Sequence, residues 1–197
     1  MKRILSIICL LMAISSVKAI DTEGSVEVAY MNGNEEYTEF VKIGYVLGIK
    51  TGEKGVIELS TSWGRGNALG LMTWKYKNVG GTMYADGFDS YNYKWFVTEI
   101  MAGYKYYFTT KDIAPFLSIN FGVDLFSSSN NNKNLDGFTF DDYFGLRFKL
   151  KDDNAFYIQA GICNKPYQVE VYSAHDGKSE FNNCRCPMIA VKAGFTF

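Results

Sequence analysis

The chain ends on the stretch Ile189-Ala190-Val191-Lys192-Ala193-Gly194-Phe195-Thr196-Phe197, whose pattern recurs through most of the sequence. Apolar residues alternate with small or polar ones, up to a terminal phenylalanine. Alternation with a period of two residues is typical of a β-strand with one apolar face. We therefore expect the last segment of the chain to be a strand with two unlike faces.

Seven earlier segments show the same alternation and are separated by stretches rich in turn residues. The eight expected strands are 25–31, 38–49, one that starts at 56, 95–108, 114–126, 138–150, one that starts at 155, and 187–197. Three short turns, 51–55, 109–112 and 151–154, alternate with longer connections, so consecutive strands are expected to pair as antiparallel neighbours. This rhythm predicts an all-β fold, an eight-stranded antiparallel up-and-down barrel that forms one domain over residues 20–197.

Three of the longer connections are less clear. The stretch from Gly66 to Tyr93 mixes glycines with aromatic residues and is either a protruding hairpin or a loop. Two polar stretches, Ser127–Gly137 and about Tyr172–Cys186, are expected to be loops. Pro166 is expected to mark the end of the membrane-crossing part of the seventh strand.

The first nineteen residues have the features of a secretory signal peptide. Lys2 and Arg3 form a basic start, an apolar run follows, and Ala19 is a small residue at the expected cleavage point. The apolar run is too short for a membrane-spanning helix, which needs about 20 apolar residues. We expect cleavage near Ala19 and export of residues 20–197.

Charge and cysteine content exclude several classes of function. Without the signal the chain has 17 basic and 21 acidic residues, and no basic excess predicts a nucleic-acid partner. The exported part has three cysteines, Cys163, Cys184 and Cys186, and an odd number cannot pair completely within one chain. Their pairing stays open, and we expect neither a metal site nor a cofactor.

Alternation alone does not say which face of the barrel points outward. A secreted lipocalin-like barrel that binds a small ligand would bury the apolar face. The polar face of the predicted strands carries many small residues, among them Gly44, Gly103 and Gly145, which suit the narrow interior of an eight-stranded barrel. Aromatic residues gather near the short turns, as in an interfacial girdle. We therefore favour a transmembrane barrel with its apolar face toward lipid.

The predicted interior then holds acidic and basic side chains in equal numbers. These candidate lumen residues are Glu27, Glu58, Glu99, Asp124 and Asp141, and Lys42, Lys105, Arg147, Lys149 and Lys192. Counting from the short turns divides them into two layers, and Lys42 is expected to be the main cation facing three carboxylates in the upper layer. Because buried charges require partners, we expect a paired network that plugs the barrel. A selective pore is the alternative.

Ser173, His175 and Asp176 lie together in the last long connection and are the candidates for a catalytic site. A nucleophile, a base and an orienting group require geometry held by rigid elements, and three near neighbours in a loop are difficult to align. We expect a solvated polar loop there and no enzyme activity, and the alternative is a lipid-modifying outer-membrane enzyme.

With the strands and turns placed, the chain resembles the outer-membrane β-barrel domain family, which includes opacity-type surface proteins and the barrel of outer membrane protein A. The resemblance rests on the signal, the strand rhythm, the segment 103–108 (Gly-Tyr-Lys-Tyr-Tyr-Phe) and the terminal segment 194–197 (Gly-Phe-Thr-Phe). It implies a bacterial outer-membrane location, contact with outer-membrane lipid, and insertion by the assembly machinery, with Phe195 and Phe197 as the assembly signal. It also implies a structural, surface-adhesion or limited porin-like role, with host or surface ligands contacted through the loops.

Overall fold

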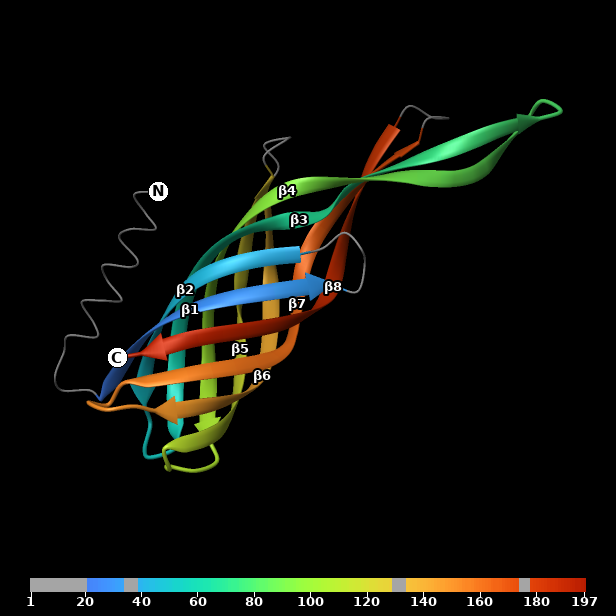
Figure 1. Cartoon of the computed structure of the whole chain (residues 1–197). Helices are drawn as coiled ribbons and strands as arrows, with labels where there is room; N and C mark the ends of the chain where they lie inside the picture. The colour runs from blue at the N-terminus through green and yellow to red at the C-terminus, as the bar shows by residue number, and fades with distance from the viewer. Residues whose placement is uncertain (1–20, 34–38, 129–133, 174–177) are drawn as a thin grey trace.

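The computed structural model describes residues 21–33, 39–128, 134–173 and 178–197, although a few side chains within these ranges lie outside the description. Within them the chain forms a closed barrel in which each strand pairs with the next and β1 pairs with β8 (Figure 1). The eight strands are β1 Thr22–Gly33, β2 Glu39–Lys50, β3 Gly55–Val79, β4 Thr82–Tyr107, β5 Ile113–Ser128, β6 Asn134–Lys149, β7 Ala155–Ser173 and β8 Lys178–Thr196. The predicted eight-stranded antiparallel barrel is confirmed.

Closure of the barrel depends on the C-terminal strand. Antiparallel pairing of β1 with β8 extends from Ser25 opposite Thr196 to Gly33 opposite Met188. Beyond this ladder, Gly24 and Phe197 exchange two backbone hydrogen bonds of 3.1 and 2.9 Å between their N and O atoms. No edge strand is left in the barrel wall, which is the condition that a β-structure must meet inside a lipid bilayer.

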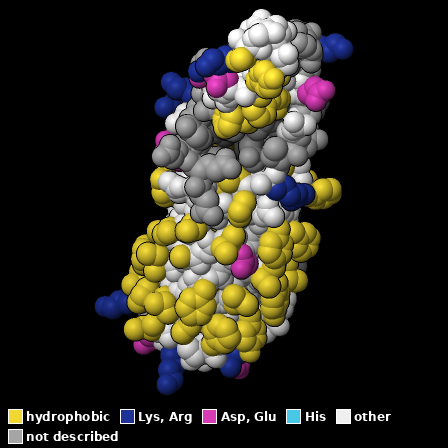
Figure 2. Space-filling view, turned by 90° about the vertical axis from the view of Figure 1, so that its right-hand side faces the viewer, with side chains coloured by type: hydrophobic (Ala, Val, Ile, Leu, Met, Phe, Trp, Pro, Cys, Tyr) yellow, Lys and Arg dark blue, Asp and Glu magenta, His cyan; other side chains and the backbone are white. Residues whose placement is uncertain are grey.

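The apolar face of the strands points out of the barrel. Phe121, Phe144 and Ile158 are 63%, 57% and 44% exposed, so the apolar-outward prediction is confirmed and the lipocalin arrangement is excluded. Hydrophobic side chains cover much of the barrel face seen in Figure 2. The described residues contain no helix that is long and apolar enough to cross a membrane.

The stretch left open between Gly66 and Tyr93 is a hairpin, not a loop. Strands β3 and β4 continue well beyond the barrel as a two-stranded ribbon (Figure 1). A two-residue turn joins them, and both of its residues, Gly80 and Gly81, have positive φ angles of 63° and 86°. Positive φ at both central positions is the requirement of the type I′ turn that suits a twisted hairpin. At its base, residues 71–74 of β3 pair in parallel with residues 170–173 of β7.

The last connection is shorter than expected, because β7 and β8 continue as paired strands. The prediction of a loop over about Tyr172–Cys186 is wrong, since β8 begins at Lys178 and Arg185 pairs with Pro166. The last residue of β7 that pairs with β6 is Asn164. Between Asn164 and residues 170–173, which pair with β3, one edge of β7 is free, and proline is tolerated at a free edge. The strand therefore continues past Pro166.

One charged residue interrupts the apolar outer face. Asp142 of β6 is exposed and pairs with Ile119 and Ile162 on the neighbouring strands, halfway along the barrel wall. A carboxylate facing lipid is unfavourable, although less so than a lysine or arginine. We predict that Asp142→Leu raises the free energy of unfolding in lipid bilayers by about 1–2 kcal/mol. Urea titration in vesicles measures this. An unchanged or lower stability would mean that Asp142 has a partner or lies outside the hydrocarbon region.

Candidate functional site: the charged lumen and an outer groove

Side chains occupy much of the interior of the barrel, and a cavity of about 810 Å³ lies at the end with the short turns. Near the short turns, Tyr107, Phe116 and Tyr157 form a buried cluster with small apolar neighbours. Toward the other end, a second buried cluster includes Phe40 and Trp95. Eight strands enclose a space just wide enough for side chains, and here aromatic rings occupy much of it. From the sequence, only small and charged residues were expected on this face, and these rings were not among the candidates.

Two glycines explain how the rings of the lower cluster fit. Gly145 lies opposite Phe116 in the β5–β6 pair, and Gly194 lies opposite Tyr157 in the β7–β8 pair. A Cβ atom at either glycine would overlap the ring of the opposite residue. Each aromatic ring therefore lies over a glycine of the neighbouring strand, which leaves room for the ring in a narrow barrel.

The lower half of the lumen holds three ion pairs. Lys105 donates a hydrogen bond to Glu58, which also accepts one from Ser118 Oγ at 3.1 Å. Lys192 Nζ lies 3.3 Å from Glu27 Oε1, and Tyr157 Oη donates to the other oxygen of Glu27 at 3.0 Å.

The third lower pair joins Arg147 Nη2 to Glu23 Oε2 at 3.9 Å. Glu23 is buried, but it precedes the expected start of the first strand and was not a candidate. Its place in β1 follows from the ladder with β2, which begins with Thr22 opposite Ile49.

The upper half is organised around a lysine that the sequence analysis missed. Lys165 Nζ lies 2.7 Å from Glu99 Oε2, 2.9 Å from Asp141 Oδ1 and 3.6 Å from Asp124 Oδ2. It also donates to Thr139 Oγ1 at 2.7 Å. The expectation that Lys42 is the main cation of this layer is wrong.

Lys42 contacts one carboxylate, Glu99, at 2.6 Å between Nζ and Oε2. Lys165 was not among the candidate lumen residues because it directly precedes Pro166, the expected end of the membrane-crossing part of the strand. The inward orientation of Lys165 was predictable from the sequence, since Lys165 has the same parity along β7 as the buried residues Tyr157 and Cys163.

Acidic groups outnumber basic ones in the upper layer. Glu99, Asp124 and Asp141 face Lys42 and Lys165, and all five side chains are buried. Among the residues that the structure describes, neither oxygen of Asp124 has a hydrogen-bond partner, and Asp124 itself has no exposed area. The other carboxylates of the layer have close partners, since Tyr143 Oη donates to Asp141 Oδ2 at 3.1 Å and Ser62 Oγ donates to Glu99 Oε1 at 3.4 Å.

Lys149 was expected in the lumen, but it lies at the exposed rim of the barrel. It is the last residue of β6, its side chain is 46% exposed, and its Nζ lies 3.3 Å from Asp153 in the β6–β7 turn. Its parity along β6 matches that of Arg147, but the strand ends there and the lysine reaches solvent at the rim. The other nine candidate lumen residues lie in the barrel interior, with Arg147 partly exposed near the rim.

The remaining candidates from the sequence lie elsewhere. Phe195 and Phe197 are exposed on the outer face near the short turns. His175 and Asp176 lie outside the described residues, as does the side chain of Ser173. Cys163 is a buried thiol whose Sγ lies 2.8 Å from Tyr143 Oη, and the side chain of Cys184 is not described. Among the described residues, no group of three or more His, Cys, Asp or Glu side chains is placed to hold a metal ion.

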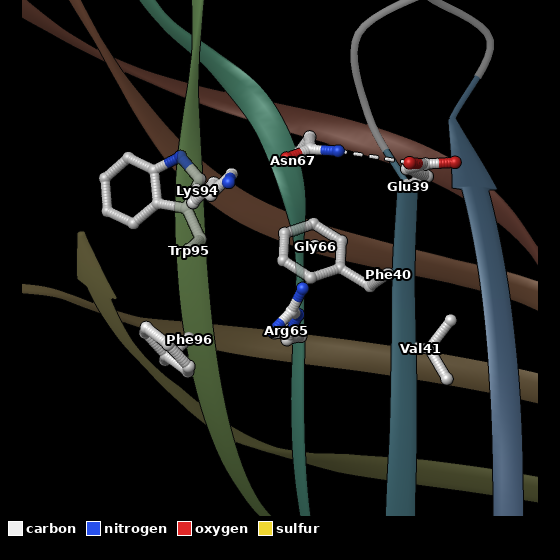
Figure 3. A pocket seen from close by; sticks show the side chains of 9 residues that line it. All are labelled: Glu39, Phe40, Val41, Arg65, Gly66, Asn67, Lys94, Trp95 and Phe96. Carbon is white, nitrogen blue, oxygen red and sulfur yellow. Dashed lines mark hydrogen bonds between the residues drawn. The ribbon is translucent and has the colours of Figure 1, made fainter. Parts of the chain in front are cut away.

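A second candidate site lies on the barrel wall where β2, β3 and β4 approach the hairpin. A cavity of about 360 Å³ is lined by three short segments, 39–41, 65–67 and 94–96 (Figure 3). Two of its lining residues are basic, Arg65 and Lys94. A more open groove of about 530 Å³ adjoins it and is lined largely by apolar side chains, including Ile43 and Trp63. Val41, Arg65 and Phe96 line both cavities.

Comparisons with known proteins find the fold in solved structures, whereas no family model and no curated protein matches the chain. The chain resembles the Neisserial surface protein A with 10% identity and a TM-score of 0.54, covering 89% of this chain and 94% of that one. It also aligns with Ail, the attachment invasion locus protein of Yersinia pestis (11% identity, TM-score 0.38, 89% and 96% covered). A third is the outer membrane enzyme PagL (15% identity, TM-score 0.41, 85% and 97% covered).

The closed eight-stranded barrel, its apolar outer face and its charged interior define the class of the protein. These are the properties of a transmembrane β-barrel of the bacterial outer membrane, with short turns on one side and long extensions on the other. At such low identity the likeness to solved structures establishes the architecture and leaves the role to be argued from the chain itself.

Proposed function

We propose that this chain is a non-enzymatic outer-membrane protein whose barrel is sealed and whose β3–β4 hairpin contacts other molecules at the cell surface. The observation that carries the proposal is the combination of a filled lumen with a long ribbon projecting from the loop side of the barrel (Figure 1). A pore requires an open interior. Here the interior holds packed side chains, and the longest extension of the wall lies outside the barrel.

The hairpin has an apolar face that is suited to binding another molecule. Trp74 and Phe88 lie opposite each other across β3 and β4, with ring centroids 5.7 Å apart in an edge-to-face arrangement. Lys75, the next residue along β3, pairs with Asp89 at 2.6 Å and so belongs to the other face. A two-stranded ribbon alone is marginally stable in water and is strengthened when its apolar face is covered. This supports a binding role for the face that carries Trp74 and Phe88.

Adhesion of whole cells tests this role. Cells that express the protein are compared with vector-only cells for attachment to cultured epithelial cells, and surface expression is measured in parallel. The double substitution Trp74→Ser and Phe88→Ser is expected to reduce attachment to the vector level, whereas Lys75→Gln on the opposite face retains it. If wild-type cells attach no better than vector cells, or if the two variants behave alike, the adhesion role is wrong.

The absence of catalysis is tested by mass spectrometry of lipid A from cells with and without the protein. Identical spectra support a non-enzymatic role, and a mass change that requires the protein would contradict it.

We also propose that residues 1–19 direct export and that Phe195 and Phe197 form the assembly signal. Deletion of Phe197 is then expected to lower the amount of protein in the outer membrane, measured by immunoblot of membrane fractions.

A further inference from the structure

The outer groove described above has the form of a site for an amphiphile. Its apolar part is bounded by Val41, Trp63 and Phe96, which project from three neighbouring strands on the lipid-facing side of the wall. The basic cavity adjoins it on the hairpin side and shares Val41 and Phe96 as walls. An apolar chain in the groove would therefore bring its polar end to Arg65 and Lys94.

The polar end of the site is positively charged. Arg65 is exposed and, among the residues that the structure describes, has no hydrogen-bond or ion-pair partner. Lys94 lies on the same outer face, because Phe96, two residues further along β4, is the register partner of Arg65. The single acid of the cavity, Glu39, accepts a hydrogen bond from Asn67 Nδ2 at 3.1 Å, and the two basic groups outnumber it (Figure 3).

The level of the site on the barrel indicates its occupant. Val41 and Phe96 are exposed apolar residues, and one step further from the short turns the three strands carry Glu39, Asn67 and Lys94. The outer surface thus changes from apolar to polar within this cavity, as it must where hydrocarbon meets headgroups. Guanidinium and ammonium groups at that level match phosphate, the former through paired hydrogen bonds.

We propose that this groove binds a phosphorylated lipid of the outer leaflet, with an acyl chain against Trp63 and Phe96 and a headgroup phosphate on Arg65 and Lys94. The proposal goes beyond the surface role of the hairpin and does not depend on it or on a sealed lumen. A free phosphate ion would use only the basic half of the site, whereas a neutral lipid would use only the apolar half.

Native mass spectrometry of the purified full-length barrel in detergent tests the proposal with three probes: diphosphoryl lipid A, chemically dephosphorylated lipid A and inorganic phosphate. The variant Arg65→Gln/Lys94→Gln is compared with Lys151→Gln, which alters an exposed lysine in the β6–β7 turn. We expect the double variant to bind diphosphoryl lipid A at least about tenfold more weakly, because two charge-assisted contacts are lost. We expect Lys151→Gln to match the wild type.

Dephosphorylated lipid A is expected to bind weakly and equally to all three proteins, and inorganic phosphate to leave no adduct. Equal binding of the two lipids by the wild type would overturn the proposal, as would unchanged binding of diphosphoryl lipid A by the double variant. Retention of inorganic phosphate at the same strength as the lipid would identify a soluble-anion site and equally refute a lipid site. Circular dichroism and heat-modifiable gel mobility of the variants ensure that the comparison is between folded barrels.

Discussion

Replacing Lys165 with methionine is expected to lower the free energy of unfolding by about 3–5 kcal/mol, because it leaves buried carboxylates without their main cation. Lys165 contacts Glu99 and Asp141 at 2.7 and 2.9 Å and lies 3.6 Å from Asp124. Methionine is unbranched and has nearly the volume of lysine, so the change removes charge and hydrogen bonds and little volume. Urea titration of the protein refolded into lipid vesicles measures the difference.

Two companion variants make this result specific. Lys42→Met is expected to have a smaller effect, since Glu99 keeps Lys165 as a partner after the loss of Lys42. Lys149→Met, at the exposed rim, is expected to change the free energy of unfolding by no more than about 0.5 kcal/mol. If all three variants lose the same small amount, the lumen is hydrated enough that ion pairing does not stabilise it.

Replacing Gly194 with valine is expected to destabilise the barrel by about 3 kcal/mol, or to prevent folding, through overpacking and the loss of a hydrogen bond to a charged group. A Cβ at this position overlaps the ring of Tyr157. Displacement of that ring would remove the 3.0 Å hydrogen bond from Tyr157 Oη to Glu27. The fraction of folded protein is read from heat-modifiable gel mobility and the stability from urea titration.

The neighbouring position provides the control for this prediction. Ala193 precedes Gly194 in β8 and points to the other face, so Ala193→Val adds similar bulk without entering the lumen. We expect Ala193→Val to fold normally, and we expect Gly194→Val combined with Tyr157→Val to recover part of the stability that Gly194→Val alone loses. Equal behaviour of Gly194→Val and Ala193→Val would show that the ring can move at little cost.

The sequence was sufficient for the architecture because period-two alternation and turn residues are local signals. The terminal stretch and the turn at 151–154 are examples, and both lie where the alternation places them. The ends of the strands were less predictable. Pro166 suggested a stop, but whether proline ends a strand depends on whether its edge is paired, and that is a property of the neighbouring strand.

The lumen was predictable in composition and not in its contacts. Parity along the strands identifies Glu27, Glu99 and Lys192 as inward residues, but it does not say which acid meets which base across the barrel. Lys165 joins acids from three strands, β4, β5 and β6, none of them near it in sequence. Its central role therefore appears only when the barrel is closed. The outer groove was likewise hidden, because its walls come from segments far apart along the chain.

The central claim, that side chains seal the lumen, is tested most directly by single-channel recording of the purified wild-type protein in planar lipid bilayers. With aromatic clusters near both ends and the charged network between them, we predict no repeatable unitary conductance, under conditions in which a known porin gives clear steps. Repeatable, ion-selective openings of the wild-type protein would contradict the sealed barrel and would favour a transport role.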